Sequence, residues 1–254
     1  MGLIAAFINT LFLINIIDNF QARGKQIILW ILLYFYSLFF IFQTDSVAAY
    51  ITTIGVHGVI CLALIWLKFR GKLRKSHYFI FFAALIFASV IVWFNLDHIF
   101  GIFNRNTTLT GRIPMWTNLY NMYLGKRPLW GFGFNAFWYL DSHRVAMQVA
   151  TGYPSPIGIS DNGFIDILVN TGFIGLFLFL VFYFGTWWYA LNFTARANNI
   201  IEMFPVILMS YTLLANISWS LIFENESFFM LLMVSILFYV SGKTSRTRLS
   251  QGIK

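Results

Sequence analysis

The stretch that decides the fold of this chain is SDNGFIDILVNTGFIGL, residues 160–176. It opens with serine, aspartate and asparagine, and a glycine then starts a long apolar run. A run of this kind predicts a membrane-spanning helix. Asp166 and Asn170 interrupt it, although a carboxylate and an amide are costly to place in hydrocarbon, so both need a partner or a function.

The composition of the whole chain supports a membrane fold. Of its 254 residues 59% are hydrophobic and only 10% are charged, and the mean hydropathy is +0.74. Soluble domains average about 25% charged residues, so lipid must cover part of this apolar surface. The net charge of +8 does not indicate nucleic acid as a partner, because the basic residues cluster between apolar runs instead of forming a stripe.

Seven apolar segments are long enough to cross a bilayer, at residues 2–18, 27–43, 47–67, 78–97, 163–189, 202–222 and 227–241. The sequence therefore predicts an all-α integral membrane protein, a polytopic bundle of about seven transmembrane helices with one large extracytoplasmic loop. Four regions follow: spans one to four (1–97), the loop (98–162), spans five to seven (163–241) and a basic tail (242–254).

The basic residues predict the orientation of this bundle. Twelve of the 17 Lys and Arg residues lie on alternate connections or in the tail, and the short opposite connections carry none. Because basic loops stay in the cytoplasm, the C-terminus is predicted to be cytoplasmic and loop 98–162 to be extracytoplasmic. An odd number of spans then puts the N-terminus outside, which suggests missing upstream spans or a reduced form. The N-terminus lacks a basic start and a small-residue cleavage site, so no signal peptide is predicted.

The long loop contains a predicted helix after residue 110. Thr110 is a candidate cap, Pro114 suits the first turn and Gly125 suits a left-handed stop. One face of this helix is aromatic and apolar: Ile113, Trp116, Tyr120 and Tyr123 or Leu124. Such a face is typical of an interfacial helix, and its aromatic rings can also stack on sugars.

The segment after this helix is rich in glycine and basic residues. Gly131 and Gly133 in GFGF do not indicate a dinucleotide site, because no strand precedes them and the third glycine is absent. They favour a tight turn that re-enters the membrane surface. Arg112, Lys126 and Arg127 are candidates for binding phosphate oxygens, or else they are solvated charges.

Two polar stripes run along the predicted spans at intervals of four residues. One consists of Asn162, Asp166 and Asn170, and the other of Thr212, Asn216, Ser220 and Glu224. Hydrogen bonding between helices explains such stripes, and so does a wet cavity open to the outer leaflet, which we favour. Asp161 at the head of the fifth span is a candidate helix cap, as is Ser160, and also a candidate general base.

The remaining polar candidates are few. His143 lies beside Arg144 in the outer loop, where it either contacts substrate or is an ordinary loop histidine. No spacing of His, Cys or Asp indicates a metal site. The single cysteine, Cys61, lies in an apolar run and is expected to behave as a small hydrophobic residue.

Four motifs, read in order, resemble the landmarks of one known family. They are GRIPMW (111–116), RPLWGFGFNAF (127–137), the stretch at 160–176 and IFENESFF (222–229). This order is similar to that of the O-antigen ligase/polymerase superfamily, whose members include polymerases of O-antigen, capsule and exopolysaccharide. The resemblance covers about residues 110–240.

The resemblance implies a GT-C-like glycosyltransferase of the bacterial inner membrane that works without a cofactor, a metal or a nucleotide sugar. It would transfer glycan from undecaprenyl diphosphate to an acceptor hydroxyl of another repeat unit at the outer face of the membrane. The implied partners are the lipid-linked oligosaccharide, the bilayer, and flippase and chain-length regulator proteins. Two alternatives stay open: ligase-type transfer to a final acceptor, and a lipid-linked oligosaccharide transporter or flippase.

The resemblance also assigns residues. Arg112 stands at the loop arginine that would neutralise the diphosphate, and Asp161 stands where many members have histidine and would activate the acceptor hydroxyl. The resemblance gives Arg127, Asn162 and Glu224 as substrate-binding residues, and the patterns described above add three more candidates, Asp166, Trp116 and His143. A carboxylate in place of imidazole keeps base chemistry but changes its pH dependence, and it weakens the case for a ligase.

Overall fold

The computed structural model describes residues 1–21, 26–69, 112–152, 155–222 and 227–250. Within these ranges the chain is helical, with no strand. The predicted span at 78–97 lies outside the described residues. The predicted all-α membrane fold is thus confirmed for the described part of the chain.

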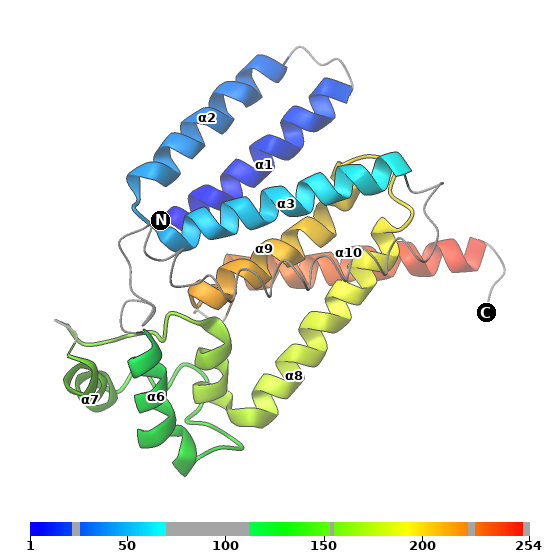
Figure 1. Cartoon of the computed structure of the whole chain (residues 1–254). Helices are drawn as coiled ribbons and strands as arrows, with labels where there is room; N and C mark the ends of the chain where they lie inside the picture. Colours follow the sequence, from blue (N-terminus) through cyan, green and yellow to red (C-terminus); the bar gives the residue numbers. More distant parts are fainter. Residues whose placement is uncertain (22–25, 70–111, 153–154, 223–226, 251–254) are drawn as a thin grey trace.

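The N-terminal part is a group of three helices. These are α1 (Gly2–Gln21), α2 (Ile27–Gln43) and α3 (Val47–Phe69). The first helix packs against the other two, and α3 also packs against α9 (Figure 1). Their limits agree with the predicted spans within a few residues because each apolar run is broken by a polar connection.

The C-terminal part contains α8 (Gly163–Thr194), η2 (Ile201–Met203), α9 (Phe204–Ser218) and α10 (Phe228–Ser250). Helix α9 contacts α3 on one side and α8 on another, so it occupies the centre of the bundle (Figure 1). It ends at Ser218, earlier than the predicted limit of 222. Helix α10 continues to Ser250, so the basic segment predicted from 242 begins as helix.

Four helices of the described part are long and apolar enough to cross a membrane: Gly2–Phe20, Val47–Phe69, Gly163–Thr194 and Ile201–Ser218. Two shorter apolar helices, Ile27–Gln43 and Phe228–Gly242, accompany them. The count of seven spans therefore stays a prediction.

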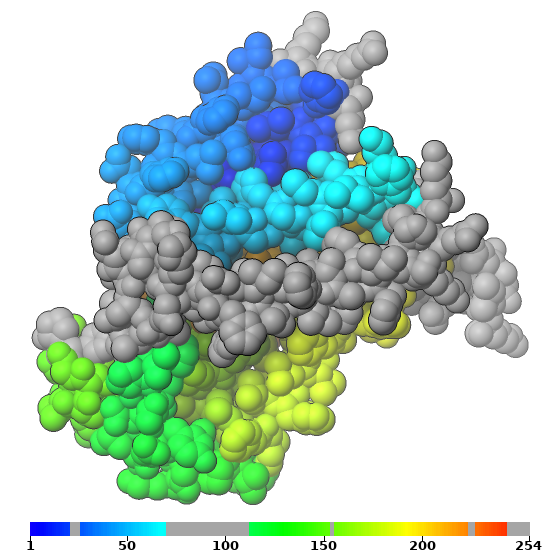
Figure 2. Space-filling model, viewed as in Figure 1, coloured from blue at the N-terminus to red at the C-terminus, as the bar shows by residue number. Residues whose placement is uncertain are grey.

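The described residues of the predicted outer loop form a small lobe with α6 (Arg112–Met122), η1 (Leu124–Lys126) and α7 (Asp141–Thr151). Its green residues gather on the side of the molecule away from α1 and α2 (Figure 2), at the same end as the start of α8 (Figure 1). Its core is built from Met115, Leu119, Phe137, Trp138 and Met147, each at most 7% exposed.

One detail of the predicted loop helix was wrong. Gly125 does not stop it in a left-handed conformation, since this glycine lies within η1. Met115 and Leu119 are buried because the helix packs on α7 and the segment before it, whereas Ile113 and Tyr120 of the predicted aromatic face are 46% and 60% exposed. The place of this helix at a membrane interface stays a prediction. Helix α7 was not predicted because it is short and polar.

Candidate active site

Helix α8 is broken at Gly172, and a loop segment fills the break. Gly172 has φ 68° and ψ −171°, values outside the helical region. Four backbone hydrogen bonds join the two segments: Phe132 N to Val169 O (3.1 Å), Gly133 N to Asn170 O (2.7 Å), Phe173 N to Pro128 O (2.8 Å) and Ile174 N to Leu129 O (3.2 Å). Groups released by the break are thereby satisfied, which a membrane interior requires.

Glycine is needed where these two backbones touch. A Cβ on Gly172 would lie 2.2 Å from the carbonyl oxygen of Leu129. A Cβ on Gly131, which has φ +64°, would lie 2.6 Å from the carbonyl of Asn170. The GFGF turn therefore packs on α8 with its backbone in direct contact, which is possible because Gly131 and Gly172 lack a Cβ.

Asn162 caps the start of α8. Its side-chain oxygen accepts hydrogen bonds from Phe164 N (3.0 Å) and Ile165 N (3.2 Å), and its Nδ2 donates to Ile217 O at the end of α9 (3.1 Å). The capping role suggested for Ser160 or Asp161 is therefore wrong. Asp161 lies one residue earlier in the left-handed region, with φ 54°, and its carboxylate takes no part in the cap.

The carboxylate of Asp161 pairs instead with Arg112. Arg112 Nε lies 3.4 Å from Asp161 Oδ2, and the two side chains are 24% and 26% exposed. Trp116, one turn along α6, donates from Nε1 to Ser160 O (2.8 Å) and so fixes α6 against the turn that carries Asp161. The structure thus brings together the two residues assigned to catalysis.

Burial raises the pKa of the Asp161 carboxyl above its ordinary value, and the charge and hydrogen bond of Arg112 oppose this rise without cancelling it. A carboxylate with a raised pKa is a better proton acceptor near neutral pH than an ordinary aspartate. The pair therefore combines a cation with a strengthened base at a partly exposed position.

Asp166 is buried behind this pair at 3% exposure. Its Oδ1 accepts hydrogen bonds from Trp138 Nε1 (2.8 Å) and from Ser160 N (3.1 Å). It therefore fixes the residue next to Asp161 as well as the loop segment that contains Trp138. Its predicted contact with substrate stays a prediction, and sequence reasoning missed both Trp138 and Ser160 as its partners.

The two polar stripes face each other or the loop. Thr212 and Asn216 are fully buried on α9, and a Cβ on Gly163 would lie 2.0 Å from Asn216 Oδ1. The same oxygen accepts from Leu221 N (3.2 Å) and Ile222 N (3.3 Å), where the chain leaves the helix. Hydrogen bonds within the protein satisfy the Asn216 oxygen, and the predicted open cavity stays a prediction. Glu224 lies outside the described residues.

Two predicted substrate ligands lie elsewhere in the lobe. Arg127 is exposed, with its guanidinium 5.3 Å from the centre of the Phe132 ring. His143 stacks on Phe137 at 4.6 Å between ring centres, and its Nδ1 lies 3.1 Å from Phe137 O. Neither position tests a role in binding substrate.

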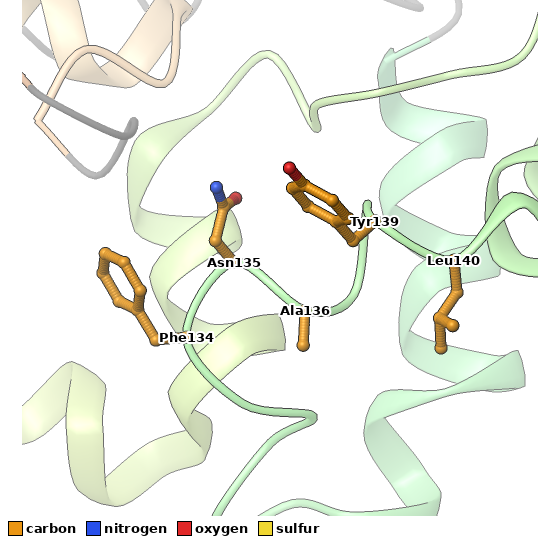
Figure 3. A pocket seen from close by; sticks show the side chains of 5 residues that line it. All are labelled: Phe134, Asn135, Ala136, Tyr139 and Leu140. Atoms are coloured by element: carbon orange, nitrogen blue, oxygen red, sulfur yellow. The ribbon is translucent and has the colours of Figure 1, made fainter.

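A pocket that sequence reasoning did not single out lies on the segment before α7. It has a volume of about 410 Å³ and is lined by Phe134, Asn135, Ala136, Tyr139 and Leu140 (Figure 3). The only signal in the sequence is Asn135, a residue type that tolerates the left-handed conformation it adopts here, with φ 53°. Among the described residues no group of three or more His, Cys, Asp or Glu side chains is placed to hold a metal ion.

Comparison with known proteins gives the class of this protein. Residues 32–180, more than half of the chain, match the O-antigen ligase family, and the chain belongs to that family. The matched range contains Arg112, Asp161 and the four bonds across the break in α8. The resemblance predicted from the four motifs is thereby confirmed.

One curated relative is the exopolysaccharide production protein ExoQ of Rhizobium meliloti (strain 1021). It is 31% identical to this chain over 145 residues, a match that covers 53% of the chain and 32% of ExoQ. The chain therefore matches about a third of the length of this relative. No solved structure matches the chain, and the GT-C-like class stays a prediction.

Proposed function

We propose that this chain forms part of a polysaccharide polymerase of the bacterial inner membrane. The enzyme transfers glycan from undecaprenyl diphosphate to an acceptor hydroxyl of a second lipid-linked repeat unit at the outer face. The observation that carries this proposal is the Arg112–Asp161 pair, a cation and a partly buried carboxylate that lie 3.4 Å apart at the start of α8. Membership of the O-antigen ligase family and similarity to an exopolysaccharide production protein support it.

The proposed chemistry requires one base and one cation. The acceptor hydroxyl oxygen bonds to the anomeric carbon while its proton passes to the Asp161 carboxylate. The bond from that carbon to the diphosphate oxygen breaks, and undecaprenyl diphosphate leaves with the electron pair. Arg112 turns from Asp161 to the diphosphate and offsets its growing charge, the kind of electrostatic help that contributes most to such reactions. Exposed Arg127 is a second cation for the same group.

A ligase that transfers glycan to a final acceptor is the second candidate, and the name of the family favours it. The product distinguishes the two enzymes, since a ligase makes one transfer and no series of lengths. A transporter is less well supported. Broken helices do occur in transporters, where they line a cavity, but the break in α8 is filled by the backbone of residues 128–133.

The test uses the purified protein in nanodiscs with the undecaprenyl-diphosphate repeat unit of the producing strain, without nucleotide sugar. We expect a ladder of lengthening glycans on a gel. Asp161→Asn should reduce it at least about 100-fold, because a general base contributes about 10²–10⁴-fold. The matched control is Asp141→Asn, which removes the carboxylate of the exposed Asp141–Arg144 pair (3.1 Å).

A ladder of normal length and yield from Asp161→Asn would reject the role of Asp161. A single transferred unit without a ladder, formed only when a final acceptor is supplied, would favour the ligase. Movement of lipid-linked glycan across the bilayer without bond formation would favour the transporter.

A further inference from the structure

One residue inside α8 holds both ends of an exposed turn. The carbonyl oxygen of Asn170 accepts from Gly133 N (2.7 Å), and its side-chain Oδ1 accepts from Phe137 N (3.4 Å). Asn170 itself is 2% exposed, and its Nδ2 donates to Asp166 O (2.8 Å). A buried amide in a membrane helix is costly, and here it fixes the conformation of residues 133–137.

The turn held in this way displays aromatic rings and an amide to the outside. Phe134 is 62% exposed and Tyr139 is 79% exposed. Between them Asn135 adopts φ 53°, a left-handed conformation that asparagine tolerates better than most residues with a Cβ. In Figure 3 the Asn135 amide and the Tyr139 ring point to the same side of the segment, and Phe134 flanks Asn135.

These side chains match the surface of a sugar ring. A pyranose has C–H groups that pack on an aromatic face and hydroxyl groups around its rim, and an amide both donates and accepts hydrogen bonds. The pocket volume of about 410 Å³ lies in the range of about 300–1,000 Å³ that is common for small-molecule sites. None of the five lining residues is charged, so the pocket suits a neutral sugar and not the diphosphate.

Asp166 holds both the pocket segment and the turn that contains Asp161. Trp138, within the pocket segment, donates to Asp166, and Asp166 accepts from the backbone of Ser160 next to Asp161. A ligand in the pocket would thus lie at a fixed position relative to the proposed base. We propose that Phe134, Asn135 and Tyr139 bind a neutral pyranose unit of the glycan substrate, an inference that rests on the proposed glycan transfer and names its sugar-recognition site.

Direct binding tests this inference without any need for catalysis. The probe is the oligosaccharide of one repeat unit, cut from the polymer of the producing strain and free of lipid and diphosphate. Its affinity for the protein in nanodiscs is measured by calorimetry, and contact with the rings by saturation-transfer NMR. We expect Tyr139→Ala and Asn135→Gly to weaken binding about tenfold each, the effect of losing one stacked ring or one buried polar contact.

The variants are chosen to leave the fold intact. Asn135→Gly removes the amide but accepts the left-handed backbone. Tyr139→Phe keeps the ring and should retain most of the affinity. Tyr36→Ala is the matched control, since Tyr36 is a 68% exposed tyrosine on α2 that does not line the pocket, and the affinity of this variant should equal that of the unchanged protein.

Two results would overturn the inference: no binding of the probe by the unchanged protein, or equal binding by Tyr139→Ala, Asn135→Gly and Tyr36→Ala. Equal binding together with quenching of the lobe's fluorescence by nitroxide-labelled lipid would assign the rings to the membrane interface. If the pocket variants lose the probe but the unchanged protein forms no glycan ladder, the sugar site stands and the polymerase proposal fails.

Discussion

The two halves of α8, residues 163–171 and 173–194, follow each other in one helix but make different contacts. In residues 163–171 the buried side chains of Asp166 and Asn170 bond to segments far away in the chain. In residues 173–194 Thr186 and Asn192 bond only to carbonyls of their own helix, Phe182 O (2.8 Å) and Trp188 O (2.9 Å). Tyr183 of the second half donates to Met209 O of α9, whereas the first half holds the loop segment in place.

The second half meets the surroundings of the protein with an apolar surface. Phe177, Leu178 and Val181 are 65%, 60% and 56% exposed, as expected for side chains that face lipid. The comparison shows that Asp166 and Asn170, the buried polar residues of the first half, fix the loop segment. In this part of the chain the cost of each buried polar group is offset by a hydrogen bond to the loop.

The largest effect should come from adding a side chain at Gly172, the break between the two halves. Gly172→Ala would place a Cβ 2.2 Å from Leu129 O at a residue with φ +68°. We expect a loss of about 4 kcal/mol or more, because neither the clash with backbone nor the left-handed conformation is relieved by a side-chain movement. Unfolding in detergent, followed by heat or denaturant, measures this loss.

Gly185→Ala in the second half is the control for this change. A Cβ on Gly185 would have no heavy atom within 4 Å apart from those of its own helix backbone, and alanine favours helix by about 1 kcal/mol over glycine. Its stability should be unchanged or raised. Equal stability of the two variants would show that the break is not a fixed part of the fold.

The next effect concerns the chemistry at the head of the first half. Arg112→Gln should lower kcat/KM about 100-fold, the cost of losing one charge-stabilising donor. It should also move the acidic limb of the pH profile to higher pH. Asp161 acts as a base only when deprotonated, and Arg112 lowers the pKa of this carboxyl, so its removal raises that pKa further.

The profile of kcat/KM against pH, measured for both proteins, gives the sign of this shift. Arg144→Gln, which removes the cation of the exposed pair on α7, is the control and should leave the acidic limb in place. An acidic limb that moves to lower pH in Arg112→Gln would contradict the assignment of Asp161 as the base.

A smaller effect should follow from weakening the contact between the first half and the loop. Trp138→Phe removes the Nε1–H that donates to the buried Asp166. We expect a loss of about 2 kcal/mol, the usual size for a hydrogen bond to a charged group. Trp188→Phe in the second half, at a side chain 65% exposed, should change stability by less than about 0.5 kcal/mol. An equal loss of stability in Trp138→Phe and Trp188→Phe would contradict the difference between the two halves of α8.

Much of this arrangement could be predicted because it follows from local composition. Apolar runs gave the limits of α2 and α3, and the order of the motifs brought Arg112 and Asp161 into one proposed site. These features depend on hydropathy along the chain or on a pattern shared by a family, and each leaves a direct signal in the sequence.

The break in α8 and the burial of its polar stripe could not be predicted in this way. A glycine in an apolar helix is ordinary, and Gly172 is distinguished only by the backbone of Leu129, more than 40 residues away. The cap was misassigned for a similar reason. Ser160, Asp161 and Asn162 are all good caps by type, and the contact of Asp161 with Arg112 decides between them.

The smallest effect separates two asparagines at different places on α8. Asn162→Ala removes the cap of the first half and the bond to Ile217 O, and should cost about 1 kcal/mol. Asn192→Ala near the end of the second half removes one exposed bond within the helix and should cost almost nothing. Because Asn162 adjoins Asp161, Asn162→Ala should also raise KM. Equal behaviour of the two variants in unfolding and in kinetics would mean that the start of α8 is held by its loops alone.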